Sequence, residues 1–251
     1  MEVTSKIIRK TGEPYTLAIE AAKASRAFDI GKDSGLFYVP KIVNFDAGAG
    51  VLEFERLDGL VTLLDMAARK DKQLLGLLKK AGQALAVIHE KLALPEQMKH
   101  ELPPEWMSCP RDNVFIHGDF GGFNLCFDES AGRLVILDWS SAPFLGNVAT
   151  YGSRFFDIIW FVIFLFYGAP RSCLFNWGAA AMADAFLAGY AESRPEIIQR
   201  LRVDFKPLMR RYYRKTVWYL AKQRSWYKAA RYLIYQLLIY PRFARYRPGK
   251  V

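Results

Sequence analysis

Residues 117–124, HGDFGGFN, constrain the fold and the chemistry of this chain more than any other segment. Three short runs of strand-like composition lie around it, at 113–117, 124–127 and 134–137. Asp138 comes directly after the last run, so Asp119, Asn124 and Asp138 all lie on short connections between strands. Phosphoryl transfer from a magnesium nucleotide needs such a set, because Mg²⁺ binds hard oxygen ligands and a further group must orient the attacking hydroxyl.

The residue types in this pattern suit separate roles. Asp138, at a strand end, is placed to bind metal ions, Asn124 offers a neutral oxygen, and Asp119 is left to orient and deprotonate a hydroxyl. Gly121 and Gly122 allow a tight or positive-φ loop close to a substrate. The alternative is an ordinary Asp-Gly turn followed by an unrelated surface carboxylate. The complete spacing H-x-D-x(4)-N with a second Asp after the next strand favours a functional origin.

The rest of the chain predicts an α+β fold. A strand at 6–10 precedes a helix from Pro14 to about Asp29, and strands follow at 38–43 and 51–55. Apolar residues spaced by four and three predict a helix over 71–92. After Asp157 the sequence is helical, and we expect Pro207 to break or kink a helix and Pro241 to end one. Strands and helices do not alternate regularly, which argues against a parallel α/β sheet.

With VILDW at 135–139, HGDFGGFN resembles the aminoglycoside phosphotransferase/choline kinase family, which has a two-lobed, protein-kinase-like fold. GQALAVIHEKL at 82–92 is similar to the helix before the catalytic loop of that family, and VLEFERLDG at 51–59 is similar to its hinge. Asp157 resembles the Asp that opens the helix after the metal motif. The resemblance covers about residues 1–170, and the remainder matches only as a helical substrate lobe.

The resemblance implies a Mg²⁺-dependent enzyme that transfers the γ-phosphate of ATP to a hydroxyl of a small-molecule or glycan acceptor. It assigns Asp119 as the catalytic base and Asn124 and Asp138 as Mg²⁺ ligands. It makes His117 an organiser of the loop and Asp157 a support for it. A chain with this fold that has lost its activity, and acts as a nucleotide-binding module, is the alternative.

The resemblance also requires a nucleotide-binding lysine on the strand before the first helix. We expect Lys6 in this role, paired with Glu20 in the helix, and Lys10 or Arg9 are the alternatives because a short strand allows a shift in register. At the hinge, backbone groups from Phe54 to Arg56 would meet the adenine.

The predicted N-lobe is short. It covers residues 1–58, with the hinge at about 53–58, and residues 59–251 form the helical C-lobe with the catalytic loop, the metal motif and basic aromatic helices. Two strands and a glycine-rich loop normally precede the lysine strand and cover the phosphates, but a lysine strand at residue 6 leaves no room for them. Either Mg²⁺ and the remaining contacts suffice, or an oligomer partner covers the site, or activity has been lost.

Positive charge is concentrated at the end of the chain. The net charge is +10, and residues 196–251 hold 15 of the 35 Lys and Arg but only two of the 25 Asp and Glu. Twelve aromatic residues are interleaved with these cations between Phe205 and Tyr246. If this tail lines the acceptor cleft, it favours an anionic acceptor over a cationic aminoglycoside. It also suits contact with an anionic membrane, whereas no nucleic-acid-binding motif is present.

Other function classes find little support. The three cysteines are scattered, and there is no zinc-ligand spacing. The most apolar run, at 158–167, has ten residues and is too short to span a bilayer. The N-terminal residues do not resemble a signal peptide. We therefore expect a cytoplasmic protein, with peripheral membrane contact as the alternative.

Overall fold

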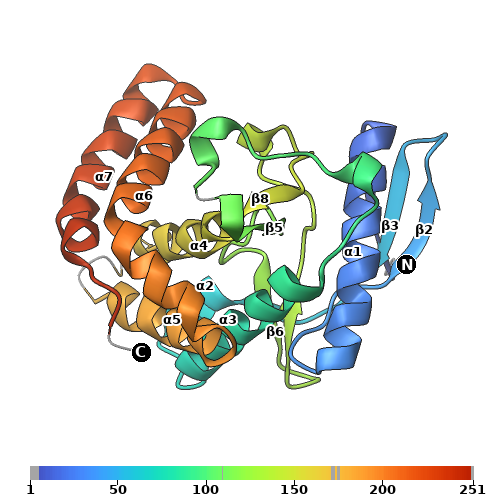
Figure 1. Cartoon of the computed structure of the whole chain (residues 1–251), viewed down its shortest axis with the longest axis horizontal. Coiled ribbons are helices and arrows are strands. Elements are labelled where there is room, and N and C mark those ends of the chain that lie inside the picture. Colours follow the sequence, from blue (N-terminus) through green and yellow to red (C-terminus); the bar gives the residue numbers. More distant parts are fainter. Residues whose placement is uncertain (1–5, 109, 171–172, 174–175, 250–251) are drawn as a thin grey trace, which may run out of the picture.

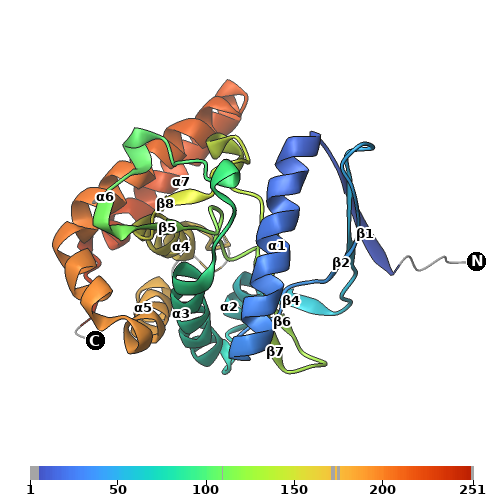
Figure 2. The ribbon, with the colours of Figure 1, turned by 45° about the vertical axis from the view of Figure 1, so that its right-hand side comes forward.

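The computed structural model describes residues 6–249 except 109, 171, 172, 174 and 175. The small N-terminal part is an antiparallel sheet in the order β1-β3-β2, with β3 in the middle. Its strands are β1 (Ile7–Thr11), β2 (Ile42–Asp46) and β3 (Val51–Glu55). Helix α1 (Pro14–Ser34) stands between this sheet and the rest of the molecule, as Figures 1 and 2 show. Among the described residues, β1 pairs only with β3 and leaves its other edge open.

The larger part holds two further sheets and most of the helices. One sheet has the order β4-β6-β7, and β5 pairs with β8. The strands are β4 (Leu60–Thr62), β5 (Asn113–Phe115), β6 (Leu125–Asp128), β7 (Arg133–Ile136) and β8 (Tyr151–Ser153). The helices are α2 (Leu63–Arg69), α3 (Leu74–Lys91), α4 (Phe155–Tyr167), α5 (Ala179–Ser193), α6 (Pro195–Lys222) and α7 (Trp226–Arg245). Short 3₁₀ turns lie at Glu96–Met98, Pro104–Trp106, Pro110–Asp112 and Pro143–Leu145.

The two parts are joined through Tyr38 as well as through the chain. The backbone N–H of Tyr38 donates to the carbonyl of Leu134, and the N–H of Ile136 donates to the carbonyl of Tyr38. This parallel bridge fixes the N-terminal part against β7, one residue before the loop that carries Asp138. The division at residue 58 remains a proposal, with β3 on one side of it and β4 on the other.

The apolar pattern of α3 forms the core, as predicted. The residues of its stripe are all buried: Leu74, Leu78, Ala81, Leu85, Ile88 and Leu92. Helix α5 crosses α3 so closely that a Cβ on Gly189 would lie 1.9 Å from the carbonyl oxygen of Lys79. The apolar run at 158–167 lies in α4, which is buried along nearly its whole length. None of the described helices has the length and apolarity needed to cross a membrane.

Two helix ends differ from the expectation. Helix α1 continues past Asp29 to Ser34, where Gly35 with φ 65° ends it. Pro207 lies inside α6, and Pro241 lies inside α7 without ending it. Both prolines are exposed. Water can therefore bind the carbonyl that each proline leaves without a partner, so packing of the inner faces outweighs the cost of the proline, about 3 kcal/mol.

Candidate active site

Asp157, in the first turn of α4, anchors the loop that carries His117 and Gly118. Its carboxylate is buried and accepts the backbone N–H of His117 at 2.8 Å and that of Gly118 at 2.9 Å. Nε2 of His89, on α3, contacts the same carboxylate at 3.0 Å, and Nδ1 of His89 lies 3.0 Å from the hydroxyl of Tyr190. Burial alone would raise the pKa of Asp157, but these hydrogen bonds and the His89 ring hold it below its usual value.

Gly118 lets the loop turn away from Asp157. Its φ is 84°, a conformation that residues with a side chain rarely adopt, and a Cβ there would lie 2.8 Å from Cβ of Ser141. Gly121 and Gly122 do not have positive φ. At Gly122 the constraint is space, because a Cβ would lie 3.0 Å from Leu64 and 3.1 Å from Phe164.

His117 is a buried, neutral organiser of this turn. Burial and the nearby Lys23 charge lower its pKa to about 4. Its Nδ1 can therefore accept the N–H of Asp119 at 3.2 Å, and its ring packs on Trp139 with centroids 4.6 Å apart. The hydrogen bond between His117 and the backbone of Asp119 fixes the direction in which the Asp119 side chain points.

The Asp119 carboxylate accepts a hydrogen bond on each oxygen. The indole N–H of Trp160, on α4, donates to Oδ1 at 3.0 Å, and Nδ2 of Asn124 donates to Oδ2 at 3.3 Å. Burial raises the pKa of Asp119 to about 6, which makes it more basic than an exposed aspartate. Sequence reasoning missed Trp160. Its position three residues after Asp157, one turn along the same helix, was the available signal.

Asn124 and Asp138 present oxygens that suit a magnesium ion. Nδ2 of Asn124 also donates to the carbonyl of Asp119 at 2.9 Å, which turns its Oδ1 the other way. Oδ1 of Asp138 accepts hydrogen bonds from Lys10 and from Ser140, each at 2.8 Å. None of the described residues donates a hydrogen bond to its Oδ2. Asp138 has φ 52°, a left-handed turn that Asp tolerates better than most residues. One carboxylate oxygen and one amide oxygen fit the ligand preference of Mg²⁺.

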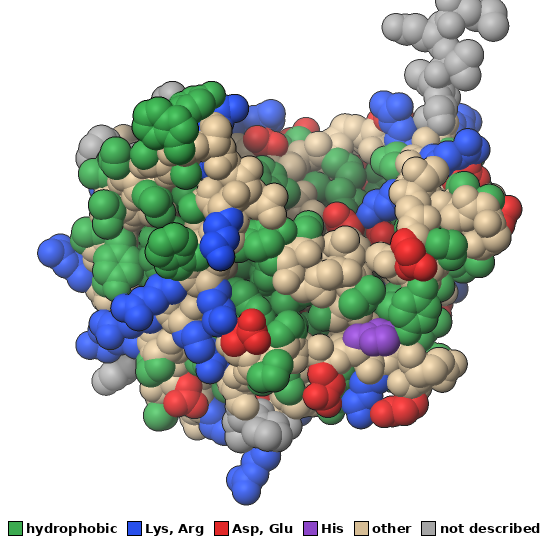
Figure 3. Space-filling view, turned by 90° about the horizontal axis from the view of Figure 1, so that it is seen from above, with side chains coloured by type: hydrophobic (Ala, Val, Ile, Leu, Met, Phe, Trp, Pro, Cys, Tyr) green, Lys and Arg blue, Asp and Glu red, His purple; other side chains and the backbone are tan. Residues whose placement is uncertain are grey.

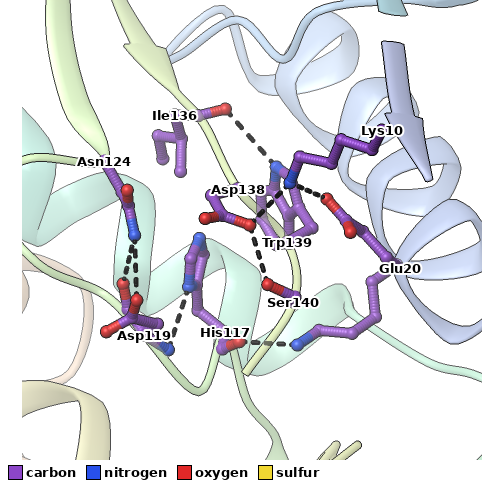
Figure 4. A network of polar contacts seen from close by, with 10 residues as sticks. Lys10, Glu20, His117, Asp119, Asn124, Ile136, Asp138, Trp139 and Ser140 are labelled. Atoms are coloured by element: carbon purple, nitrogen blue, oxygen red, sulfur yellow. Dashed lines mark hydrogen bonds and ion pairs between the residues drawn. The ribbon is translucent and has the colours of Figure 1, made fainter. Parts of the chain in front are cut away.

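Lys10, rather than Lys6, reaches Glu20. Nζ of Lys10 lies 2.5 Å from Glu20 and 2.8 Å from Asp138, so it joins β1, α1 and the Asp138 loop, as Figure 4 shows. Burial disfavours this charge, but the two carboxylates raise the pKa of Lys10 above its usual value. The expected Lys6–Glu20 pair is wrong. Lys6 lies about 13 Å further along the strand, at about 3.3 Å per residue, and is exposed.

Lys23 is a second lysine at the site, and sequence reasoning missed it. Its side chain is fully buried, and Nζ donates to the carbonyl of His117 at 2.5 Å. Burial lowers its pKa to about 8 despite the nearby charges of Asp157 and Glu20. The available signal was its spacing from Glu20, because residues three apart share one face of a helix. Helix α1 thus contacts both Lys10, through Glu20, and the loop at His117, through Lys23.

The expected hinge contacts are partly taken by the protein itself. The backbone N–H of Arg56 donates to the carbonyl of Lys6, and its side chain pairs with Asp58 at 2.9 Å. The ring of Phe54 lies beneath Lys10, with Nζ 5.9 Å from its centroid. Adenine binding by backbone groups from Phe54 to Arg56 stays a prediction, and the N–H of Arg56 is not free for it.

Two hollows are lined by residues of this site. One, of about 390 Å³, lies between β1, α1 and the Asp138 loop and is lined by Lys10, Thr16, Glu20, Asp138, Ser140 and Asn147 among others. The other, of about 680 Å³, includes Asp119 and is walled by α4, α6 and α7. Its lining is mostly apolar and rich in aromatic residues, among them Phe144, Trp160, Tyr167, Tyr213, Tyr219 and Tyr232. Of the cations of residues 196–251, Arg224 is the one that lines this second hollow in the described part of the chain.

The chain is similar in structure to solved kinases, among them a glucosamine kinase. A glucosamine kinase aligns with a TM-score of 0.54 at 14% identity, over 93% of this chain and 71% of that chain. A glucosamine kinase in complex with glucosamine, ADP and inorganic phosphate aligns with a TM-score of 0.53 at 15% identity, over 86% and 70%. A choline kinase from Streptococcus pneumoniae gives 0.44 at 16% identity, over 82% and 87%. No protein-family model and no curated protein matches the sequence.

At this level of identity the glucosamine kinase alignments show the fold alone. They confirm the predicted α+β, protein-kinase-like architecture over most of the chain.

Proposed function

We propose that this chain is an ATP-dependent phosphotransferase that acts on a hydroxyl of a small-molecule or glycan acceptor. The observation that carries the proposal is the position of Asp119, at the edge of the aromatic hollow and bonded to Asn124, next to the hollow that holds Lys10 and Asp138. A base that faces an acceptor site and oxygen ligands that face a phosphate site are the parts that phosphoryl transfer requires.

In the proposed mechanism Asp119 accepts the proton of the attacking hydroxyl. Its pKa of about 6 leaves it ionised at pH 7 and still basic enough to take a proton. The indole of Trp160 fixes the orientation of the carboxylate. Asn124 and Asp138 would hold Mg²⁺, which when bound neutralises charge on the phosphoryl group. Lys10, held by Glu20, would bind the phosphates of ATP.

The residues that line the second hollow indicate which kind of acceptor would fit it. The preference for an anionic acceptor assumed that the basic tail lines the cleft, and α6 and α7 do wall it. Among the described residues, this region lines the hollow with three tyrosines, with Thr216, Gln223 and Gln236, and with a single cation, Arg224, so most of its positive charge lies outside the hollow. Gln236 is 3% exposed, and its Oε1 has no hydrogen-bond partner among the described residues. A hydroxylated acceptor with an apolar or aromatic body would fill this hollow and donate a hydrogen bond to Gln236.

A nucleotide-binding module without turnover is the second candidate. The open edge of β1 favours it, because no described strand pairs with that edge beside Lys10. Without such a cover the phosphates stay more accessible to water. Against it stands the complete set of Asp119, Asn124 and Asp138 with its supporting hydrogen bonds.

The test is Mg²⁺-dependent ATP consumption with a panel of anionic sugars, neutral amphipathic alcohols and hydroxylated amines. Phosphorylated product should form with the wild-type protein and with Asp29→Asn, a change on the exposed face of α1, but not with Asp119→Asn. Thermal stabilisation by ATP with Mg²⁺, without product from any acceptor, would support the second candidate. If the protein shows neither stabilisation by ATP with Mg²⁺ nor turnover of any acceptor, both candidates are refuted.

A further inference from the structure

Helix α7 is apolar on two opposite faces. Its inner face packs into the molecule through buried Ile239 and Phe243. Its outer face carries large apolar side chains that remain exposed: Trp226, Tyr227, Leu233, Ile234, Leu237 and Leu238. A surface helix normally carries one apolar face that packs on the core and a polar face toward water, so a second, exposed apolar face on α7 indicates a further contact.

The exposed residues form one continuous strip. Trp226, Ile234 and Leu238 follow one another at multiples of four residues, and Leu237 lies beside Leu238. Trp226 is 82% exposed, Leu237 70%, and Ile234 and Leu238 60% each. At about 150–200 Å² per side chain, these four expose about 400–550 Å², which is as large as the largest apolar patch of a typical monomer.

Cations border this strip, and acidic residues do not. No Asp or Glu occurs after Asp204. Lys228 lies beside Tyr227, with Nζ 5.9 Å from its ring centroid, and Arg242 follows Leu238 by one helical turn. Figure 3, which looks down on the end of the α6–α7 hairpin, shows hydrophobic side chains gathered on its left side with Lys and Arg next to them.

We infer that the outer face of α7 docks onto the surface of a bilayer that contains anionic lipid. Trp226 and Tyr227 would sit at the level of the headgroups, Ile234, Leu237 and Leu238 would enter the boundary of the acyl chains, and the bordering cations would meet lipid phosphates. A second copy of the chain suits this face less well. A two-fold interface would set the Lys and Arg of one copy against the same residues of the other.

Docking in this way places the aromatic hollow at the membrane. Tyr232 and Gln236 line the hollow from α7, and Leu237 and Leu238 lie on the other side of that helix. The hollow is therefore about one helix diameter, about 10 Å, from the lipid surface. An acceptor hydroxyl carried by an amphipathic molecule would reach Asp119 from there. This last step rests on the proposed function, whereas the docking itself does not.

The test is co-sedimentation of the full chain with vesicles of phosphatidylcholine alone and of phosphatidylcholine with one third phosphatidylglycerol. We expect binding to the anionic vesicles, weaker binding to the neutral ones, and only partial loss of binding at high salt. The double substitution Leu237→Gln and Leu238→Gln should weaken binding at least about tenfold, because two exposed leucines would no longer enter the bilayer. Val203→Gln, at an 80% exposed position on α6, is the matched control and should leave binding unchanged.

The outcomes separate docking from catalysis. Asp119→Asn should bind vesicles like the wild-type protein, since binding requires neither ATP nor an acceptor. Lys228→Gln with Arg242→Gln should lower the preference for anionic over neutral vesicles several-fold. The inference is overturned if the wild-type protein binds neither vesicle, or if the leucine substitutions do not change binding. It is also overturned if the wild-type chain forms a stable dimer that these substitutions dissociate while vesicles stay unbound.

Discussion

Replacement of Asp157 by Asn should lower the stability of the protein, because it removes hydrogen bonds that anchor the loop at His117 and Gly118. The carboxylate accepts three hydrogen bonds, from the backbone of His117, the backbone of Gly118 and the ring of His89. The first and third of these share Oδ2, and the second uses Oδ1. An amide keeps one acceptor oxygen. If that oxygen faces Gly118, an NH₂ group opposes the N–H of His117 and loses the contact with His89.

The expected loss of stability follows from the number of hydrogen bonds that are lost. A hydrogen bond to a charged, buried group contributes about 1.5–3 kcal/mol, so the loss of two bonds costs about 3–6 kcal/mol. That is a large part of the stability of a typical domain, about 5–15 kcal/mol. In urea, with a slope of about 2 kcal/mol/M, the smaller loss already lowers the unfolding midpoint by about 1.5 M.

The assay is urea unfolding followed by circular dichroism, with Asp29→Asn as the matched control. That control changes an exposed aspartate of α1, and its unfolding free energy should stay within about 0.5 kcal/mol of the wild-type value. If Asp157→Asn costs less than about 1 kcal/mol, the carboxylate does not anchor the loop, and the account of the site is wrong.

Three more changes test other parts of the site. Lys10→Met should raise the KM for ATP at least about tenfold and Lys6→Met should not, and equal effects would contradict the lysine assignment. The pKa of Lys23 is lowered to about 8 in the fold, so the unfolded state binds more protons than the folded state between pH 8 and 10.5. Over this range the free energy of unfolding of the wild-type protein should rise by up to about 3 kcal/mol relative to that of Lys23→Met. Parallel curves of unfolding free energy against pH for the two proteins would refute this. Gly118→Ala should lower Tm more than Gly132→Ala, which has similar φ but open space for a Cβ, and similar losses would exclude a steric role.

Much of the site could be read from the sequence because its residues are close along the chain. Asp119, Asn124 and Asp138 are set by short connections between strands, which leave few arrangements open. Lys6 was wrongly paired with Glu20 because the prediction counted residues along the chain and ignored how far a strand and a helix each extend per residue. β1 and α1 run antiparallel, and Glu20 lies about 10 Å into the helix at 1.5 Å per residue. Lys10 is the last residue but one of β1, close to the turn into α1, whereas Lys6 lies four residues further from that turn.

Other contacts depend on packing that one sequence does not reveal. Lys23 looks like an ordinary helix lysine until α1 packs over the carbonyl of His117. The proline of α7 was misjudged because local propensity was outweighed by packing of the opposite face of that helix. The charge of the tail was counted correctly, but only the fold reveals that α6 and α7 turn aromatic rings inward.

The most direct test of the central claim is the initial rate of Mg²⁺-dependent phosphate transfer from ATP to an amphipathic hydroxyl acceptor, measured for the wild-type protein and for Asp119→Asn. We predict product with the wild-type protein and a rate at least about a hundredfold lower with the variant, while both bind ATP with Mg²⁺ equally well. Equal rates in the two proteins would contradict the claim that Asp119 is the base of a phosphotransferase.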